Sequence, residues 1–137
     1  MARIAEAMKR GAGAQAPRYT LDQIDEMDGS QFEKFLGELF ARMGYSVQIT
    51  GRAGDQGCDL LIEKAGEKTV VQAKCYSRPV TNDAVQEAVA AKALYGATAT
   101  MVVTNSEFTD SAKELAGVNG VQLCGRERLT DLLSQLF

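Results

Sequence analysis

Apolar side chains recur along the chain with two different periods, and each change of period marks an element that the sequence predicts. After Ser30 they recur every three or four positions until Gly44, which is the pattern of an amphipathic helix ending at a stop residue. From Tyr45 to Ile49 they alternate as in a strand. The same criteria predict helices near residues 21–27, 30–43, 82–95, 109–116 and 126–137, strands at 45–49, 58–63, 68–76, 97–104 and 121–124, and a glycine-containing loop at 51–57.

The order of these elements predicts an α/β sandwich. From residue 30 onward it is α-β-β-β-α-β-α-β-α, and the helix between the third and fourth strands supplies the crossover that parallel strands need. We therefore expect a mixed sheet that helices cover on both faces. Residues 1–18 contain an Ala- and Gly-rich stretch, so we expect a flexible N-terminal tail or linker there and one folded domain at 19–137.

Composition narrows the classes of function. The chain has 137 residues, 45% of them hydrophobic and 24% charged, as in one ordinary globular domain. It has no stretch apolar enough to span a bilayer and no secretory signal, so no membrane attachment is expected. Three cysteines without a CxxC pair favour reduced thiols and a cytoplasmic protein. The absence of histidine excludes Ser-His and Cys-His mechanisms, and the net charge of −3 argues against coating nucleic acid by charge alone.

Two polar residues interrupt an apolar strand at residues 70–75. Gln72 and Lys74 project from one face of this strand, because strand side chains alternate. A buried, unpaired ammonium group would cost several kcal/mol, so Lys74 needs an anionic partner or a partly open position. Periodicity alone leaves two interpretations open: a functional site, or an edge strand whose polar face meets solvent.

Asp59 favours the functional interpretation. It begins the preceding strand, which a short turn joins to the strand that carries Gln72. Alternation places Asp59 on the face of Leu61 and Glu63, so that it can lie beside Gln72 and Lys74. An isolated Asp at the start of a strand is more often a turn former. Together with the Gln-x-Lys pair, however, it becomes a candidate metal site.

The ordered set of motifs resembles Mrr-type restriction endonucleases. Gly54-Asp-Gln-Gly-Cys-Asp59, followed by a strand, a turn and Gln72-Ala-Lys74, is similar to the GDxGxD…QxK signature of that family. The family belongs to the PD-(D/E)xK nuclease superfamily, which is related to archaeal Holliday junction resolvases. The resemblance extends over about residues 28–135 and implies a restriction-endonuclease-like three-layer α/β/α sandwich around a central mixed sheet.

The resemblance also implies roles for individual residues. Asp59 would be the central metal-binding carboxylate, Gln72 would occupy the position of the second acid, and Lys74 would be the motif lysine. Glu33 aligns with a helix glutamate that often completes such sites. The cofactor implied is Mg²⁺, which prefers hard oxygen ligands and which Mn²⁺ can replace. Glutamine in place of a carboxylate is the pattern of the Mrr-like branch, although it lowers the negative charge available to the cation.

Several of these residues have simpler explanations. Ser30-x-x-Glu33 matches a capping box, in which Glu33 would bond the Ser30 backbone N–H. At about 100° per residue, however, Glu33 lies only about 90° from the centre of the apolar arc, so it can also reach a site. Asp55 is either a turn residue or a support for the metal ligands. Three flanking residues, Arg52, Tyr76 and Arg78, are candidates for contacts with the DNA backbone, although surface arginines more often only face solvent.

The function expected from this resemblance is metal-dependent hydrolysis of DNA phosphodiester bonds by an endonuclease. One alternative is a structure-specific nuclease similar to Holliday junction resolvases, which would require a homodimer with two sites. Another is a module of the same fold that binds DNA without cleaving it. Mrr-like enzymes usually join the catalytic domain to a DNA-recognition domain, so a separate recognition domain or subunit is an expected partner. The motifs do not indicate the sequence, structure or methylation state of the DNA.

Overall fold

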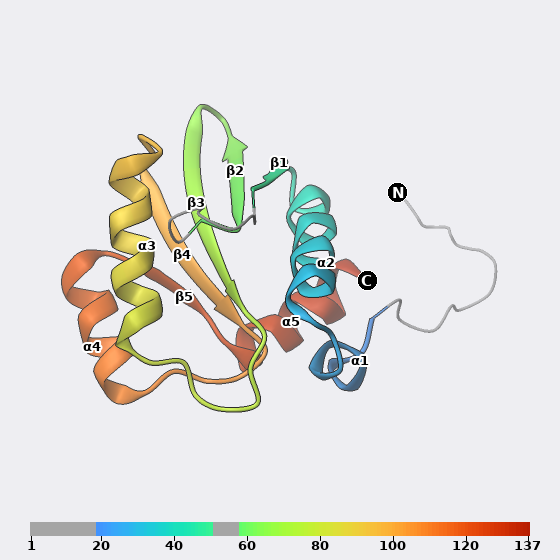
Figure 1. Ribbon diagram of the computed structural model, residues 1–137. Coiled ribbons are helices and arrows are strands. Elements are labelled where there is room, and N and C mark those ends of the chain that lie inside the picture. Colours follow the sequence, from blue (N-terminus) through green and yellow to red (C-terminus); the bar gives the residue numbers. More distant parts are fainter. Residues whose placement is uncertain (1–18, 51–57) are drawn as a thin grey trace.

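The computed structural model describes residues 19–50 and 58–137, and in this part of the chain a five-stranded sheet forms the centre of the fold (Figure 1). The strands are β1 (Ser46–Ile49), β2 (Leu60–Lys64), β3 (Glu67–Lys74), β4 (Ala99–Thr104) and β5 (Gln122–Cys124), in that order across the sheet. The first three strands pair antiparallel, whereas β3, β4 and β5 pair parallel. The sheet is therefore mixed, as predicted, and β3 is its central strand.

A tight turn joins β2 to β3 and sets the register of the hairpin. Ala65 and Gly66 occupy the turn with φ angles of 53° and 81°, and both angles are positive as in the type I′ turns that suit twisted hairpins. Lys64 and Glu67 are paired directly next to the turn. The same register, continued down the hairpin, pairs Leu60 with Val71 and brings the start of β2 to the end of β3.

Helices cover both faces of the sheet and give the predicted three layers (Figure 1). The helices are α1 (Leu21–Asp25), α2 (Gly29–Arg42), α3 (Asn82–Leu94), α4 (Asp110–Asn119) and α5 (Arg126–Leu136). On one face, α1, α2 and α5 enclose the larger core, which contains Phe32, Phe35 and Val71. On the other face, α3 and α4 pack on β4 through small residues such as Ala88 and Ala112.

Some element boundaries differ from those that the sequence predicts. Helix α2 begins at Gly29, one residue earlier than predicted, because Asp28 rather than Ser30 is its N-cap. Helix α4 continues past the predicted end at Ala116 and stops at Gly120, whose φ of 67° is the left-handed conformation that ends many helices. The predicted tail at residues 1–18 and the predicted loop at 51–57 lie outside the described residues. Within the described ranges, no helix is long and apolar enough to cross a membrane.

Candidate active site

Asp59 lies directly before β2, where hydrogen bonds hold both its backbone and its side chain. The Asp59 N–H donates to the Val71 carbonyl, and the Asp59 carbonyl accepts from the Thr50 N–H, each at 2.9 Å. The carboxylate Oδ2 of Asp59 accepts from the backbone N–H of Ala73 at 2.8 Å. Asp59 is therefore anchored to the residues on either side of Gln72, which confirms that it lies beside the polar segment of β3.

Asp59 reaches this position through a break in strand alternation that the sequence did not reveal. Cys58 packs with Val70 on the α3 face of the sheet, whereas Leu60 packs in the core on the α2 face. In a regular strand these two residues would share a face. Leu60 pairs with Val71 in the sheet, and the Asp59 N–H also donates to the Val71 carbonyl. Asp59 and Leu60 therefore both lie opposite the single residue Val71. This is the arrangement of a β-bulge, which redirects a side chain.

The carboxyl group of Glu33, on α2, meets that of Asp59. Partial burial, the negative charge of Asp59 and a hydrogen bond between the two carboxyl groups together raise the pKa of Glu33 to about 7. Two carboxylates this close repel each other unless a proton or a cation lies between them. A cation between the two carboxyl groups would relieve this repulsion, so the pair is a candidate cation site.

The capping role proposed for Glu33 is wrong. The Asp28 carboxylate accepts from the Gln31 N–H at 2.8 Å, and the Gln31 side chain accepts from the Asp28 N–H at 2.9 Å. This reciprocal pair is the capping box of α2, so the helix start does not need the Ser30-x-x-Glu33 pair. Glu33 lies one turn into the helix, at the edge of its buried face, and its side chain is available to Asp59.

Gln72 and Lys74 lie on the opposite face of the sheet from Val71 and share one partner, Glu87 of α3. The Nε2 of Gln72 donates to Oε1 of Glu87 at 2.6 Å, and Nζ of Lys74 lies 3.5 Å from the same oxygen. The predicted common face of Gln72 and Lys74 is thus confirmed, as is the need of Lys74 for an anionic partner. The edge-strand interpretation is wrong, because β3 lies between β2 and β4 and Gln72 is only 3% exposed.

The remaining polar atom of Gln72 has no partner. Its Oε1 is buried, and no described residue donates a hydrogen bond to it. A buried carbonyl oxygen left without a donor is costly, so such atoms usually have a water, ion or catalytic role. Glu33, Asp59 and Gln72 all carry hard oxygen atoms of the kind that suits Mg²⁺. The hydrogen bond from the Ala73 N–H holds Asp59 beside the strand position of Gln72. No group of three His, Cys, Asp or Glu residues in the described ranges could hold a metal ion, so a cation at this position would depend on two carboxyl groups and the glutamine amide.

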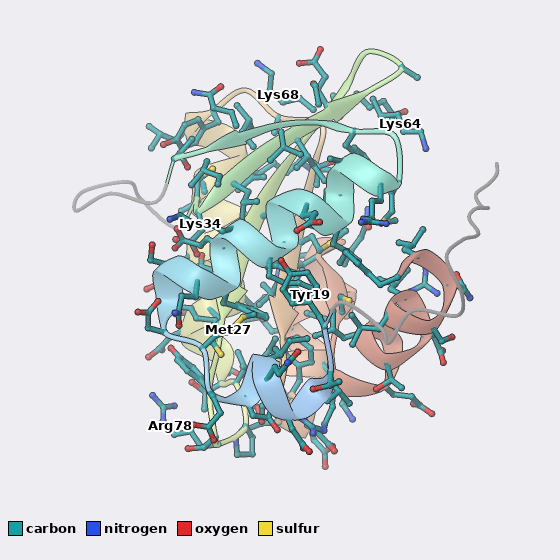
Figure 2. The ribbon with its side chains drawn as sticks, turned by 90° about the vertical axis from the view of Figure 1, so that its right-hand side faces the viewer. Tyr19, Met27, Lys34, Lys64, Lys68 and Arg78 are labelled. Atoms are coloured by element: carbon teal, nitrogen blue, oxygen red, sulfur yellow. The ribbon has the colours of Figure 1, made fainter. Side chains whose placement is uncertain are left out.

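Of the predicted DNA-contacting residues, Tyr76 and Arg78 lie together past the end of β3. The Arg78 guanidinium lies over the Tyr76 ring, 4.3 Å from its centroid, and Nζ of Lys74 lies 5.8 Å from the same centroid. Figure 2 shows Arg78 at the end of the molecule opposite Lys64 and Lys68, which flank the hairpin turn. The predicted DNA contact Arg52 and the predicted support Asp55 lie outside the described residues.

A buried asparagine holds the chain that leaves β3. Asn105 is 4% exposed, and its Oδ1 accepts from the Tyr76 N–H at 2.8 Å. Its Nδ2 donates to Asp25 at 2.9 Å, and Arg126 forms hydrogen bonds with both Asp25 oxygens at 2.9 and 3.1 Å. The hydrogen bond from Arg126 lowers the pKa of Asp25. These residues line a cavity of about 350 Å³ next to Tyr76.

The mixed five-stranded sheet with helices on both faces defines the class of protein as a restriction-endonuclease-like domain. The chain belongs to the Mrr_cat restriction endonuclease family, whose model matches residues 24–133. It is 31% identical over 140 residues to the type IV methyl-directed restriction enzyme EcoKMrr of Escherichia coli strain K12. That match covers 96% of this chain but only 46% of the enzyme, so the chain spans about half the length of this relative.

Two solved structures share the fold. The DNA modification-dependent restriction endonuclease AspBHI superposes with a TM-score of 0.66 at 17% identity, over 92% of this chain and 39% of AspBHI. MspJI, solved in complex with a 27-mer oligonucleotide, superposes with a TM-score of 0.51 at 18% identity, over 87% of this chain and 34% of MspJI. The predicted restriction-endonuclease-like fold and the resemblance to the Mrr family are confirmed.

Proposed function

We propose that this domain is a metal-dependent DNA endonuclease that hydrolyses phosphodiester bonds. The observation that carries the proposal is the Glu33–Asp59 carboxyl pair, whose Asp59 member is held by the backbone N–H of Ala73, between Gln72 and Lys74. Membership of a restriction endonuclease family supports cleavage as the activity. The combination of two carboxylates, an amide oxygen and a lysine at one end of a strand supports a hydrolytic site over a surface that only binds.

Glu33, Asp59 and Gln72 would hold the cation. Their oxygens are the ligands that Mg²⁺ prefers, and the unpartnered Oε1 of Gln72 supports such a role. Mn²⁺ can replace Mg²⁺ at such a ligand set. Because the described ligands include two carboxylates, water and phosphate oxygens would complete the coordination, as they commonly do for Mg²⁺. When bound, the cation would polarise the scissile phosphate and lower the pKa of a bound water molecule.

The protein side chains have separate tasks in this scheme. The Asp59 carboxylate is kept in one orientation by the Ala73 N–H, so it does not have to reorganise when substrate arrives. Glu33 loses its proton before it can act as an anionic ligand. Lys74 would offset the charge that develops on the phosphate, and Glu87 balances its positive charge until DNA is bound.

DNA would be held partly outside this site. Tyr76 and Arg78 continue from Lys74 along the chain, and we propose that they contact the phosphate backbone together with Arg52, with Asp55 supporting the metal ligands. The net charge of −3 supports dependence on a separate DNA-recognition domain or subunit. A homodimer is the alternative partner, since it would present two sites to the DNA. All three cysteines are free thiols, which supports a cytoplasmic setting where such an enzyme would meet DNA.

Cleavage assays with four substrates test the proposed function. Plasmid, methylated plasmid, linear duplex and four-way junction DNA are incubated with the protein in Mg²⁺, Mn²⁺ or EDTA. We expect cleavage with either cation and none in EDTA. Preference for the junction would identify a resolvase, and binding without cleavage of any substrate would identify a non-cleaving module.

Substitutions in the site provide the second test. Asp59→Ala and Lys74→Ala should each reduce the cleavage rate by at least about 10²-fold, because Asp59 would hold the cation and Lys74 would offset the charge that develops on the phosphate. Glu63→Gln, which removes an exposed carboxylate two strand positions beyond Leu61, is the matched control and should cleave at the wild-type rate. Undiminished cleavage by Asp59→Ala protein would refute the proposed site.

A further inference from the structure

Glu87 is the one acidic side chain of α3 that contacts the candidate active site in the described structure. Its Oε1 accepts from Nε2 of Gln72 at 2.6 Å and lies 3.5 Å from Nζ of Lys74. The Glu87 side chain is 50% exposed, whereas Gln72 is 3% exposed. A surface glutamate thus extends inward to an amide that is buried in the sheet.

The chemistry of this hydrogen bond fixes which end of the Gln72 amide faces Glu87. An ionised carboxylate has no proton to donate, so only the NH₂ group of the amide can face it. The carbonyl oxygen of Gln72 then points away from Glu87, and it is the atom that has no partner among the described residues. The two ends of an amide are nearly the same size, so packing alone would not select one orientation.

The orientation matters because only one end of the amide can bind a cation. The carbonyl oxygen is a ligand for a hard divalent ion, whereas the NH₂ group carries protons and has no free lone pair for one. A carboxylate at position 72 would not have this problem, because both of its terminal atoms are oxygens. Glutamine at this position therefore needs a neighbour that selects the productive orientation.

We propose that Glu87 is a positioning residue that locks the Gln72 amide so that its oxygen faces the cation. The inference rests on the proposed function, since it assigns a partner to one of the proposed ligands. Groups that orient metal ligands in this way commonly affect metal affinity by about 10–100-fold. The same carboxylate also holds the Lys74 ammonium next to Gln72, so one side chain fixes both polar residues of the strand.

The metal-free protein provides the first test. In ¹⁵N-labelled protein the side-chain NH₂ signal of Gln72 is compared among wild type, Glu87→Gln and Asp83→Asn, the last being a control that removes an exposed carboxylate from the same helix. We expect a downfield N–H signal in wild type and in the control, because a short bond to a carboxylate deshields the proton. The signal should return to the ordinary range in Glu87→Gln. An unchanged signal would overturn the proposal, whether or not the protein cleaves DNA.

Cation affinity in a double-mutant cycle provides the second test. Mn²⁺ binding is measured for wild type, Glu87→Gln, Gln72→Glu and the double variant, with thermal melting to verify that each is folded. Glu87→Gln should weaken Mn²⁺ binding by about 10–100-fold when position 72 is glutamine. The same change should cause no loss when position 72 is glutamate, because a carboxylate presents oxygen in either orientation.

The cycle separates positioning from other roles. An equal loss in both backgrounds would mean that Glu87 acts through its own charge or as a ligand, and the proposal would be wrong. Failure of wild-type protein to bind Mn²⁺ would overturn both this proposal and the proposed function. If wild-type protein binds Mn²⁺ and the four proteins show the expected pattern of affinities, but none cleaves DNA, only the proposed function would be contradicted.

Discussion

At the scale of single residues, the raised pKa of Glu33 links protein stability to pH. Partial burial and the neighbouring Asp59 raise this pKa from 4.5 to about 7, so the folded state favours the protonated form. A group with a raised pKa in the folded state contributes stability below its unfolded pKa and loses that contribution as pH rises through the folded pKa. In metal-free protein, the melting temperature should therefore decrease as the pH rises from about 4.5 to about 7. Part of this decrease is the loss of the stabilising contribution of Glu33.

The variant Glu33→Gln tests this link, because glutamine keeps the shape of the side chain and cannot ionise. Circular dichroism melting of metal-free protein from pH 4.5 to pH 8 should show a smaller decline for Glu33→Gln than for wild type. The size of the difference will be less than the full pKa shift implies, since solvent screens the half-exposed pair. Glu114→Gln, an exposed change on α4, is the control. Identical pH profiles for Glu33→Gln and wild type would contradict the raised pKa of Glu33.

Single-residue predictions from the sequence succeeded where strand alternation determined the answer. The common face of Gln72 and Lys74 follows from their spacing of two and needs no tertiary information. The partner of that face could not be predicted in the same way, because Glu87 is on a helix that meets β3 only after folding. A helical wheel provides one signal, since Glu87 lies about 60° from buried Ala84 at about 100° per residue and so borders the buried arc.

At the scale of elements, types and order were predictable, but two local details were not. The sequence predicted every helix and strand of the described fold, because each has a clear apolar period or a strong stop residue. The start of α2 was misplaced because Asp28 and Ser30 are both good cap residues, and only the structure shows that Asp28 makes the bonds. The break in alternation at Asp59 was missed, because one extra residue leaves no mark in a period-two pattern.

Close packing of α3 on the sheet predicts the effect of a larger side chain beneath it. Ala88 is fully buried next to Glu87, and its carbonyl accepts a hydrogen bond from Thr100 at 2.9 Å. Ala88→Leu should lower the free energy of unfolding by about 1–3 kcal/mol, because the extra atoms have no space between helix and strand. The same change should weaken Mn²⁺ binding, since it moves Glu87 away from Gln72.

The control for this prediction lies two residues along the same helix. Ala90 is exposed, so Ala90→Leu adds the same volume without entering the sheet interface. Urea denaturation should show a change of less than about 0.5 kcal/mol for Ala90→Leu. Equal destabilisation by the two variants would mean that α3 does not depend on small residues for its contact with the sheet.

At the scale of the whole molecule, the balance of charge predicts weak binding of DNA. The chain has fifteen basic and eighteen acidic residues. A protein with a net negative charge releases few counterions from DNA, so this effect adds little to its binding free energy. We expect metal-free protein to bind duplex DNA no more tightly than about 10⁻⁶ M at physiological salt, the upper end of ordinary non-specific affinity. Fluorescence anisotropy with methylated and unmethylated duplexes measures this affinity, and nanomolar binding to either duplex would contradict the prediction.

The layered arrangement has a consequence for the cell that makes this protein. Glu33 belongs to the helical layer on one face of β3 and Glu87 to the layer on the other, so the candidate site draws on both layers (Figure 1). During translation, residues up to Lys74 leave the ribosome before α3 and β4, which cover and pair with β3. A nascent chain would thus carry Lys74 before Glu87, which holds its ammonium group, and β3 before its parallel partner β4. The candidate site would therefore be complete only after the second half of the domain has emerged and folded, which under the proposed function would delay DNA cleavage until synthesis of the domain is finished.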